Sequence, residues 1–301
     1  MTDQADSREP NVDHATAANP FGLPADIELR AAAALSATPR SFLRWAGSKQ
    51  RLLPQLVPYL PSSFNTYFEP FLGAGALFFL LQPPNARLGD MCAPLVETYR
   101  SVASHHLAIH DLLSTMDILD RDEYYRIRAA HPTNAVKAAA RFIFLNRGAW
   151  NGLYRVNTRG EFNVPYGRPR SPNIIDLQNL RACANLLSRP TVSVSVSDFE
   201  TLASEAKSGD FVYFDPPYVT GHNNNGFIDY NQKLFSWSDQ VRLAALAERL
   251  RKRGVHVMVS NAEHEAIIAL YPNFRVGSVT RRSTLASSIA ARKQITEAVF
   301  Y

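Results

Sequence analysis

The segment NTYFEPFLGAGALFFLL, residues 65–81, decides the fold of this 301-residue chain. An aromatic strand leads into two glycines, Gly73 and Gly75, and an apolar run that starts a helix follows them. Two glycines two positions apart let the backbone turn tightly beneath a ligand. The spacing lacks the third glycine of the dinucleotide fingerprint, so a nicotinamide-type cofactor is disfavoured. A tight turn that binds nothing is the alternative interpretation.

Strands and helices alternate outward from this segment. We expect strands at 86–90, 191–199, 211–215, 255–263 and 294–301, and helices at 92–116 and 238–254. This alternation predicts a three-layer α/β fold. A polar helical stretch at 120–147 and a loop region at 148–172, rich in Gly, Asn, Arg and Pro, interrupt the alternation. The interruption predicts an inserted, mostly helical second domain.

The sequence therefore divides into three parts. Residues 1–38 are expected to be a disordered or loosely helical extension, residues 39–110 and 191–301 the α/β domain, and residues 111–190 the insertion. The first 40 residues hold three basic and six acidic side chains, so the rest of the chain carries a net charge of +8. Charge of this sign favours a polyanionic partner such as nucleic acid, though only weakly by itself.

Cysteine and histidine usage argues against a disulfide framework and against a metal site. Cys92 and Cys183 form no paired motif. His106 and His110 have helical spacing, but no glutamate lies between them as it does in metalloproteases. The sequence has neither an apolar run of membrane-spanning length nor a basic start followed by an apolar stretch. We therefore expect a cytoplasmic protein with no metal.

Two more strands end in acids at the edge where open α/β sheets bind their ligands. Asp90 closes the strand after Gly73 and Gly75, where an acid in doubly wound folds accepts hydrogen bonds from ribose hydroxyls. Asp198 and Phe199 end another strand, and we expect them to hold an adenine ring. The alternatives are a turn aspartate at position 90 and a helix start at position 198.

The motif Asp215-Pro216-Pro217-Tyr218 ends a fourth strand at the same edge. The exocyclic amine of a nucleobase is a poor nucleophile because its lone pair is delocalised into the ring. The Asp215 carboxylate and the Pro216 carbonyl would accept hydrogen bonds from its two N–H groups. These bonds would pull the nitrogen toward tetrahedral geometry and free its lone pair. Prolines fix φ and remove competing donors, and Tyr218 offers a flat face for a base. A proline stop after a strand would explain the prolines alone.

With these motifs the chain resembles the Dam-type DNA adenine methyltransferases, which are α-class amino-methyltransferases that use S-adenosylmethionine. The shared motifs are FLRWAGSKQRLLPQL (42–56), FEPFLGAGAL (68–77), LGD (88–90), LNRGAWNGLYRVNTRGEFNVPYGR (145–168), DPPY (215–218) and VSNAE (259–263). The resemblance covers residues 41–301. It implies a Rossmann-like methyltransferase sheet, with 39–110 and 191–301 as the catalytic domain and 111–190 as the target-recognition domain.

The resemblance also implies which residues hold S-adenosylmethionine. The tryptophan and lysine of the WAGxK motif would help to bind it, loop 69–75 would lie under its methionine moiety, and the acid of LGD would bind its ribose. The acid of DPPY would lie near both the methyl donor and the target amine. The expected cofactor residues are thus Trp45, Lys49, Glu69, Phe71, Gly73, Gly75, Asp90, Asp198, Phe199 and Asp215.

On the DNA side the resemblance implies contacts from Arg44, Trp150, Asn151, Arg155 and Arg168. The Trp-Asn-Gly step at 150–152 would insert into the duplex and support extrusion of adenine. An exposed loop with arginines and an aromatic wedge suits that task; a core tryptophan and solvated or phosphate-bound arginines are the alternatives. The family more often has Lys and Tyr at positions 44 and 150, which bears on the target sequence, for which we expect GATC.

The sequence thus predicts an enzyme that methylates the exocyclic amine of adenine in double-stranded DNA by base flipping. We expect a monomer, encoded by a bacterial cell or a phage, that works either alone or beside a cognate restriction enzyme. The alternatives left open are methylation of the cytosine amine, of RNA or of a protein glutamine, and a DNA-binding homologue without catalysis. An acid rather than Asn at position 215 disfavours the glutamine and many RNA substrates.

Overall fold

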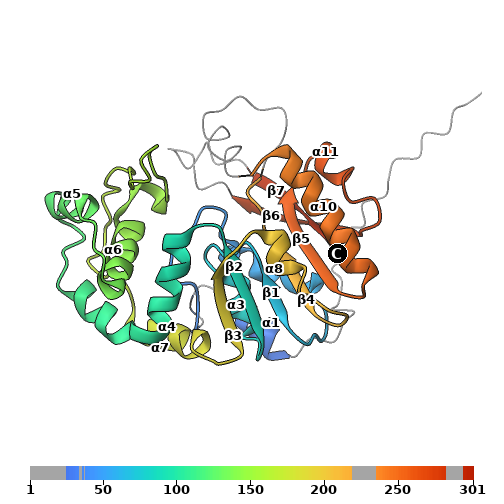
Figure 1. Ribbon diagram of the computed structural model, residues 1–301, viewed down its shortest axis with the longest axis horizontal. Coiled ribbons are helices and arrows are strands. Elements are labelled where there is room, and N and C mark those ends of the chain that lie inside the picture. Colours follow the sequence, from blue (N-terminus) through green and yellow to red (C-terminus); the bar gives the residue numbers. More distant parts are fainter. Residues whose placement is uncertain (1–24, 34–35, 37, 219–234, 283–293) are drawn as a thin grey trace, which may run out of the picture.

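The computed structural model describes residues 25–33, 36, 38–218, 235–282 and 294–301, which form a seven-stranded sheet (Figure 1). Its strand order is β3-β2-β1-β4-β5-β7-β6. β7 runs antiparallel to both of its neighbours, whereas the other pairs are parallel. The strands are β1 (Tyr67–Glu69), β2 (Ala86–Asp90), β3 (Val192–Val196), β4 (Phe211–Phe214), β5 (His256–Ala262), β6 (Val276–Arg282) and β7 (Gln294–Phe300).

Helices cover both faces of the sheet, so the expected Rossmann-like α/β fold is confirmed. The α-helices are α1 (Ala25–Ala32), α2 (Leu53–Leu56), α3 (Ala76–Leu81), α4 (Ala93–Ser114), α5 (Arg121–Ala129), α6 (Ala135–Gly148), α7 (Leu177–Leu187), α8 (Phe199–Ala203), α10 (Trp237–Lys252) and α11 (Glu265–Ile268). Three short 3₁₀ turns are η1 (Lys49–Arg51), η2 (Val57–Tyr59) and η3 (Trp150–Gly152). The strand order reverses between β1 and β4, which is where open α/β sheets bind ligands.

Alternating residues of the central strands feed two separate cores. Along β4, Phe211 and Tyr213 join the core beneath α1 to α7, whereas Val212 and Phe214 join the core beneath α8, α10 and α11. Successive side chains of a strand point to opposite faces, so a strand covered on both sides is apolar throughout. This explains why FVYF is a continuous apolar run, and it places the residue after Phe214 at the ligand edge.

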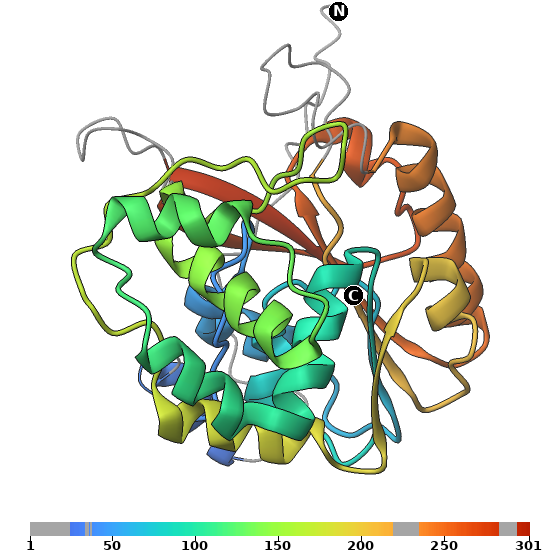
Figure 2. The same cartoon turned by 60° about the vertical axis from the view of Figure 1, so that its left-hand side comes forward.

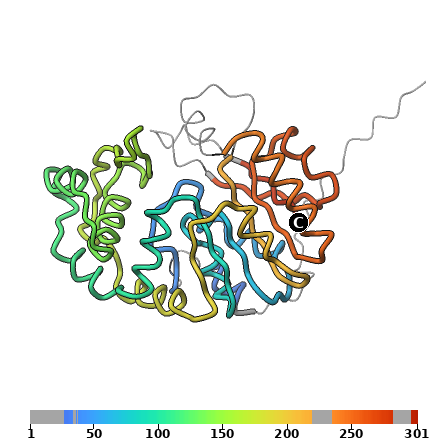
Figure 3. Tube along the Cα trace, in the orientation of Figure 1, coloured from blue at the N-terminus to red at the C-terminus, as the bar shows by residue number. Residues whose placement is uncertain are grey.

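Helices α5 and α6 project from the sheet as a lobe (Figures 2 and 3), whereas α7, which also falls within 111–190, packs against α4 and β3. The expected helical stretch at 120–147 is two helices, because the chain leaves the helix at Ala130 and Asn134 caps the next one. Pro132 lies in that break, where it has no amide hydrogen for a helix. Apolar side chains of the lobe, such as Tyr124 and Ile143, belong to the same core as the sheet residue Leu88.

The N-terminal segment 1–38 is described only in part. Helix α1 buries Ile27 and Ala31 in the main core and packs against α2 and α3, so this stretch is integral to the α/β fold. Residues 1–24, 34–35 and 37 lie outside the described residues, and so does the expectation of disorder there. Among the helices that the structure describes, none combines the length and apolarity needed to cross a membrane.

Candidate active site

The glycine loop between β1 and α3 requires glycine at both predicted positions. Gly73 has a φ of +45° and Gly75 a φ of +62°, which side chains on L-residues disfavour. A Cβ at position 73 would lie 2.8 Å from Cδ1 of Trp45, so the indole ring sits directly against the loop. The fold therefore brings the WAGxK tryptophan and the glycine loop together, as the resemblance implied.

Asp90 ties this loop to the end of β2. Its Oδ2 accepts a hydrogen bond from the Gly73 amide at 3.0 Å, and its Oδ1 accepts one from the Cys92 amide at 2.9 Å. Burial raises the pKa of Asp90, although these amides oppose the rise. The hydroxyl of Tyr99 donates to the Gly73 carbonyl at 3.0 Å. The loop is thus fixed from both sides, which is the pre-organisation that a cofactor loop needs.

A buried ion network surrounds Asp215, which directly follows β4. The Lys49 ammonium lies 2.6 Å from Oδ1 of Asp215 and 3.6 Å from Oε2 of Glu297 on β7. Arg281 on β6 contacts Oε1 of Glu297 at 2.5 Å, and the Tyr218 hydroxyl donates to Oε2 at 2.8 Å. Lys49 also lies 5.0 Å from the centroid of the Tyr218 ring. Lys49, Tyr218 and Arg281 come from three different segments of the chain and therefore meet at the carboxylate of Glu297, while Lys49 also contacts Asp215.

Two acceptors at this edge stay open. Within the described part of the chain, no group donates to Oδ2 of Asp215 or to the carbonyl oxygen of Pro216. Burial raises the pKa of Asp215 to about 6, against the lowering effect of Lys49. The carboxylate is therefore ionised at neutral pH, when it can accept an N–H donor.

Glu69, at the end of β1, is a second buried acid near this edge. Burial raises its pKa to about 8, although the Tyr67 hydroxyl, which donates to Oε2 at 3.0 Å, opposes the rise. Asp215 and Asp90 add repulsion that raises it further. Glu69 is mostly neutral at pH 7, so it adds little negative charge beside Asp215. Its hydrogen bond with Tyr67 fixes its side chain where the glycine loop begins.

The predicted adenine residues Asp198 and Phe199 lie at the end of β3 and the start of α8. Asp198 caps α8 by accepting from the Glu200 amide at 2.9 Å, which is the helix-start alternative, and it also forms an ion pair with Arg242 at 2.8 Å. The Phe199 ring is buried and stacks on Phe71 at 5.4 Å. A role for this pair toward an adenine ring stays a prediction.

The predicted DNA residues gather where η3 meets the WAGxK segment. Asn151 and Gly152 both have positive φ, and a Cβ at position 152 would lie 2.7 Å from Cβ of Arg44. Trp150 is 49% exposed, so the alternative of a core tryptophan is wrong. The side chain of Asn146 accepts from the Arg44 amide at 2.8 Å and donates to the Arg44 carbonyl, which clamps this segment to α6.

Arg155 and Arg168 lie on the irregular segment that follows η3. Backbone pairing of Val156 with Phe162 forms a hairpin, and Nε of Arg155 donates to Oδ1 of Asn163 at 2.8 Å. Arg168 has a φ of +53°. Both arginines therefore belong to the lobe that carries Trp150 but come from different parts of it.

Comparison with known proteins decides the family. The sequence pattern of the D12 class N6 adenine-specific DNA methyltransferases matches residues 45–285. The chain belongs to this family. It is 36% identical over 267 residues to the Type II methyltransferase M1.LlaDCHI of Lactococcus lactis subsp. cremoris, an alignment that covers 86% of this chain and 94% of the relative.

Two further relatives of this D12-class methyltransferase span similar lengths. The Type II methyltransferase M.MjaIII of Methanocaldococcus jannaschii is 37% identical over 266 residues, with 81% of this chain and 91% of the relative covered. The DNA adenine methylase of Serratia marcescens is 33% identical over 267 residues, with 86% and 96% covered. The enzyme is thus an adenine-specific DNA methyltransferase, as the resemblance to Dam-type enzymes predicted.

Sequence reasoning did not place four residues at this methyltransferase site. Glu297 and Arg281 complete the network around Asp215, and the available signal was an acid inside the apolar strand QITEAVF. Met91 follows Asp90 at the ligand edge, where its apolar side chain is 68% exposed. Asn146 is buried inside α6, and only its contact with Arg44 reveals its role.

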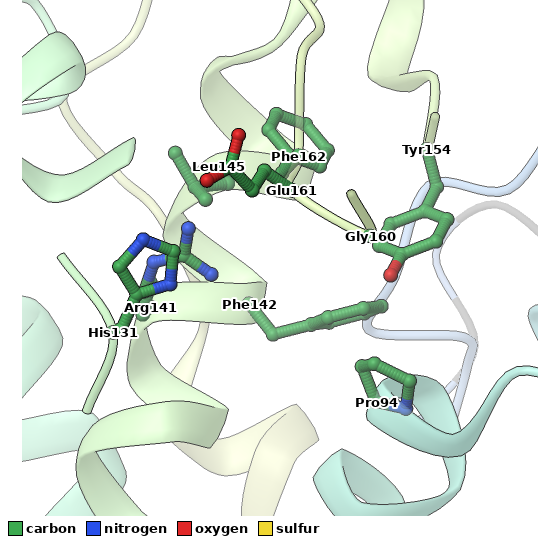
Figure 4. Close-up of a pocket in the computed structure, with 9 residues that line it drawn as sticks. All are labelled: Pro94, His131, Arg141, Phe142, Leu145, Tyr154, Gly160, Glu161 and Phe162. Carbon is green, nitrogen blue, oxygen red and sulfur yellow. The ribbon is translucent and has the colours of Figure 1, made fainter. Parts of the chain in front are cut away.

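A small pocket of this methyltransferase, about 100 Å³ in volume, lies away from the Asp215 network (Figure 4). It opens between the hairpin and α6, with Tyr154 on one side and His131 and Arg141 on the other. The ring centroids of Tyr154 and Trp45 lie 5.6 Å apart, so Tyr154 connects the pocket to the tryptophan that lies against the glycine loop. Its lining residues are Pro94, His131, Arg141, Phe142, Leu145, Tyr154, Gly160, Glu161 and Phe162.

Proposed function

We propose that this D12-class enzyme transfers a methyl group from S-adenosylmethionine to the exocyclic amine of an adenine that is flipped out of duplex DNA, within GATC. The observation that carries the proposal is a pair of acceptors at the end of β4, Oδ2 of Asp215 and the Pro216 carbonyl, to which no described residue donates. Two acceptors on consecutive residues suit an amine with two N–H bonds.

The residues at the glycine loop fit the cofactor. Gly73 and Gly75 give the loop the positive φ of a tight turn, Asp90 lies beside them with its carboxylate oxygens, and Met91 exposes an apolar face at the same edge. These would supply a tight backbone turn, a ribose acceptor and an apolar contact. When bound, S-adenosylmethionine supplies an electrophilic methyl group.

The chain's own residues would then activate the amine. The Asp215 carboxylate and the Pro216 carbonyl accept hydrogen bonds from its two N–H groups and so localise its lone pair. The Tyr218 ring supports the target adenine, because Lys49 and Glu297 hold that ring in place. The amine nitrogen becomes cationic and strongly acidic on methylation, so its extra proton can pass to water without a strong base. Because Asp215 must be ionised to accept, the rate should fall as the pH drops below about 6.

On the DNA side, the exposed Trp150 on a turn with two positive-φ residues is suited to fill the space that a flipped base leaves. Arg44, Arg155 and Arg168 supply positive charge around it. The names of two relatives as Type II methyltransferases support a cognate restriction enzyme as partner. We also propose that the enzyme acts as a monomer.

The experiment is methyl transfer to unmethylated plasmid DNA with radiolabelled S-adenosylmethionine, followed by sequencing of the modified bases. We expect label on N6 of adenine in GATC. Label on cytosine would overturn the proposed base, and adenine methylation in another sequence would overturn GATC alone. Tight DNA binding without label would identify a non-catalytic homologue.

A further inference from the structure

Glu297 on β7 is a fully buried acid that belongs to none of the sequence motifs. Its carboxylate receives the Tyr218 hydroxyl at 2.8 Å and Arg281 at 2.5 Å, and it lies 3.6 Å from the Lys49 ammonium. Burial alone would raise its pKa, but Lys49, Arg281 and Tyr218 together hold the pKa below its usual value. Glu297 is therefore a buried anion whose charge is compensated on three sides.

The partners of Glu297 lie far from it in the sequence but belong to the reaction site. Tyr218 is 79 residues away and ends the DPPY motif, and Lys49 is the lysine of WAGxK. Lys49 contacts Asp215 and Glu297 with the same ammonium group, at 2.6 and 3.6 Å. The carboxylate at 297 thus reaches both ends of the DPPY motif, directly at its tyrosine and through Lys49 at its aspartate.

Strand geometry explains how one side chain can do this. β7 lies between β5 and β6, and Val279 of β6 is paired directly with Glu297. Arg281 is two residues farther along β6, a diagonal distance that a long side chain spans. Arg281 therefore holds the carboxylate from the neighbouring strand, while Tyr218 and Lys49 approach it from the ligand edge.

We propose that Glu297 is a positioning residue for methyl transfer: it fixes the Tyr218 ring through its hydroxyl, and it shares Lys49 with Asp215 so that one oxygen of Asp215 stays open. The inference rests on the proposed role of Asp215. Its proposed role requires no contact with the target base or the methyl donor, because Glu297 acts through Tyr218 and Lys49.

Glu297 also sets the charge balance that Asp215 experiences. The groups that influence ionisation of Asp215 and Glu297 from the surrounding elements are Lys49, Glu69, Tyr213, Tyr218 and Arg281. The negative charge of Glu297 raises the pKa of Asp215, whereas Lys49 lowers it. Removal of that negative charge should therefore lower the pKa of Asp215 and move the acid limb of the methyl-transfer rate to lower pH.

The test compares Glu297→Gln with the wild-type enzyme in single-turnover methyl transfer at saturating DNA and cofactor, from pH 5 to pH 8. We expect the plateau rate to fall by ~10- to 100-fold, the range that a small misplacement of reacting groups costs, and the acid limb to move to lower pH. Glu248→Gln is the matched control, because this glutamate of α10 pairs with Arg251 and Lys252 and lies outside every shared motif. Its rate and acid limb should match the wild-type enzyme.

A wild-type rate in Glu297→Gln, or a lower rate with an unmoved acid limb, would overturn the inference. If that variant does not fold, as judged by its thermal unfolding, Tyr218→Phe decides: it removes the hydroxyl bond and keeps the charge at 297. A lower rate with an unmoved acid limb in Tyr218→Phe would support the inference, and a wild-type rate would overturn it. Near-normal turnover by Asp215→Ala would instead overturn the proposed function on which the inference rests.

Discussion

The two polar regions of this methyltransferase treat their charges in opposite ways. At the catalytic edge, which we define as Lys49, Asp215, Tyr218, Arg281 and Glu297, each cation contacts at least one carboxylate. The recognition face, which we define as Arg44, Arg147, Trp150 and Arg155, has arginines that contact neutral groups. Within the described residues, none of its three arginines forms an ion pair.

The recognition face holds its arginines through neutral acceptors. Nη1 of Arg44 donates to the Arg147 carbonyl at 3.4 Å, and Arg155 donates to Asn163. Nε of Arg147 is buried with no partner among the described residues. Burial, together with Arg44 and Arg40, lowers the pKa of Arg147 to about 10.

The difference shows which cationic side chains are already paired with carboxylates of the protein and which are available to a ligand. A buried carboxylate needs cations to offset its lost hydration, and the catalytic edge supplies them internally. Uncompensated arginines repel one another and gain most when a polyanion approaches, because phosphates replace the missing carboxylates. The catalytic edge should therefore govern the chemical step, and the recognition face should govern DNA binding.

The largest expected effect comes from the catalytic edge. We expect Asp215→Ala to lower the single-turnover methyl-transfer rate by ~10²- to 10³-fold, which is the cost of removing one preorganised electrostatic partner of a transition state. DNA affinity should stay within a few-fold of wild type. A filter-binding titration beside the rate measurement checks both. Loss of DNA binding in step with the rate would break the division between the two regions.

An intermediate effect is expected from Trp150→Ala. The wedge offsets the few kcal/mol that unstacking and unpairing cost, so methylation of a perfect duplex should fall by about tenfold. Methylation of a duplex whose target adenine is already mispaired should fall less than about threefold, because less of that cost remains. Equal losses on the two duplexes would remove the wedge role and leave Trp150 as a surface contact.

The smallest effect is expected from Arg155→Ala, which removes one arginine that has no carboxylate partner among the described residues. If it meets a phosphate, DNA binding weakens a few-fold, and the slope of log K against log salt falls by about 1. Glu297→Gln should leave this slope unchanged, which makes it the control from the other region. An unchanged slope with relaxed sequence preference in Arg155→Ala would assign a base contact instead.

Much of the fold could be predicted because its signals are local. The strand at 86–90 is β2 as expected, and the two glycines of the loop have the positive φ that their spacing suggested. The helical stretch expected at 120–147 holds two helices, and the helical spacing on both sides of Pro132 gave no sign of the break between them. The order of the motifs along the sequence indicated the family, and the pattern of that family matches residues 45–285.

The residues that sequence reasoning missed act over long distances in the chain. Asn146 clamps the backbone of Arg44 from 102 residues away. An asparagine in a helix offers no local signal for this, because its two bonds reach another segment. Glu297 could have been suspected as an acid in an apolar strand, but its partners could not.

The sequence by itself determined the sheet, the glycine turn and the acids at the strand ends, because apolar periodicity and the steric freedom of glycine act within a few residues. Only the tertiary structure decided that Lys49 is shared between Asp215 and Glu297 and that Asn146 holds Arg44. Charge compensation depends on distance in space, and the order of strands in the sheet, β7 between β5 and β6, sets that distance.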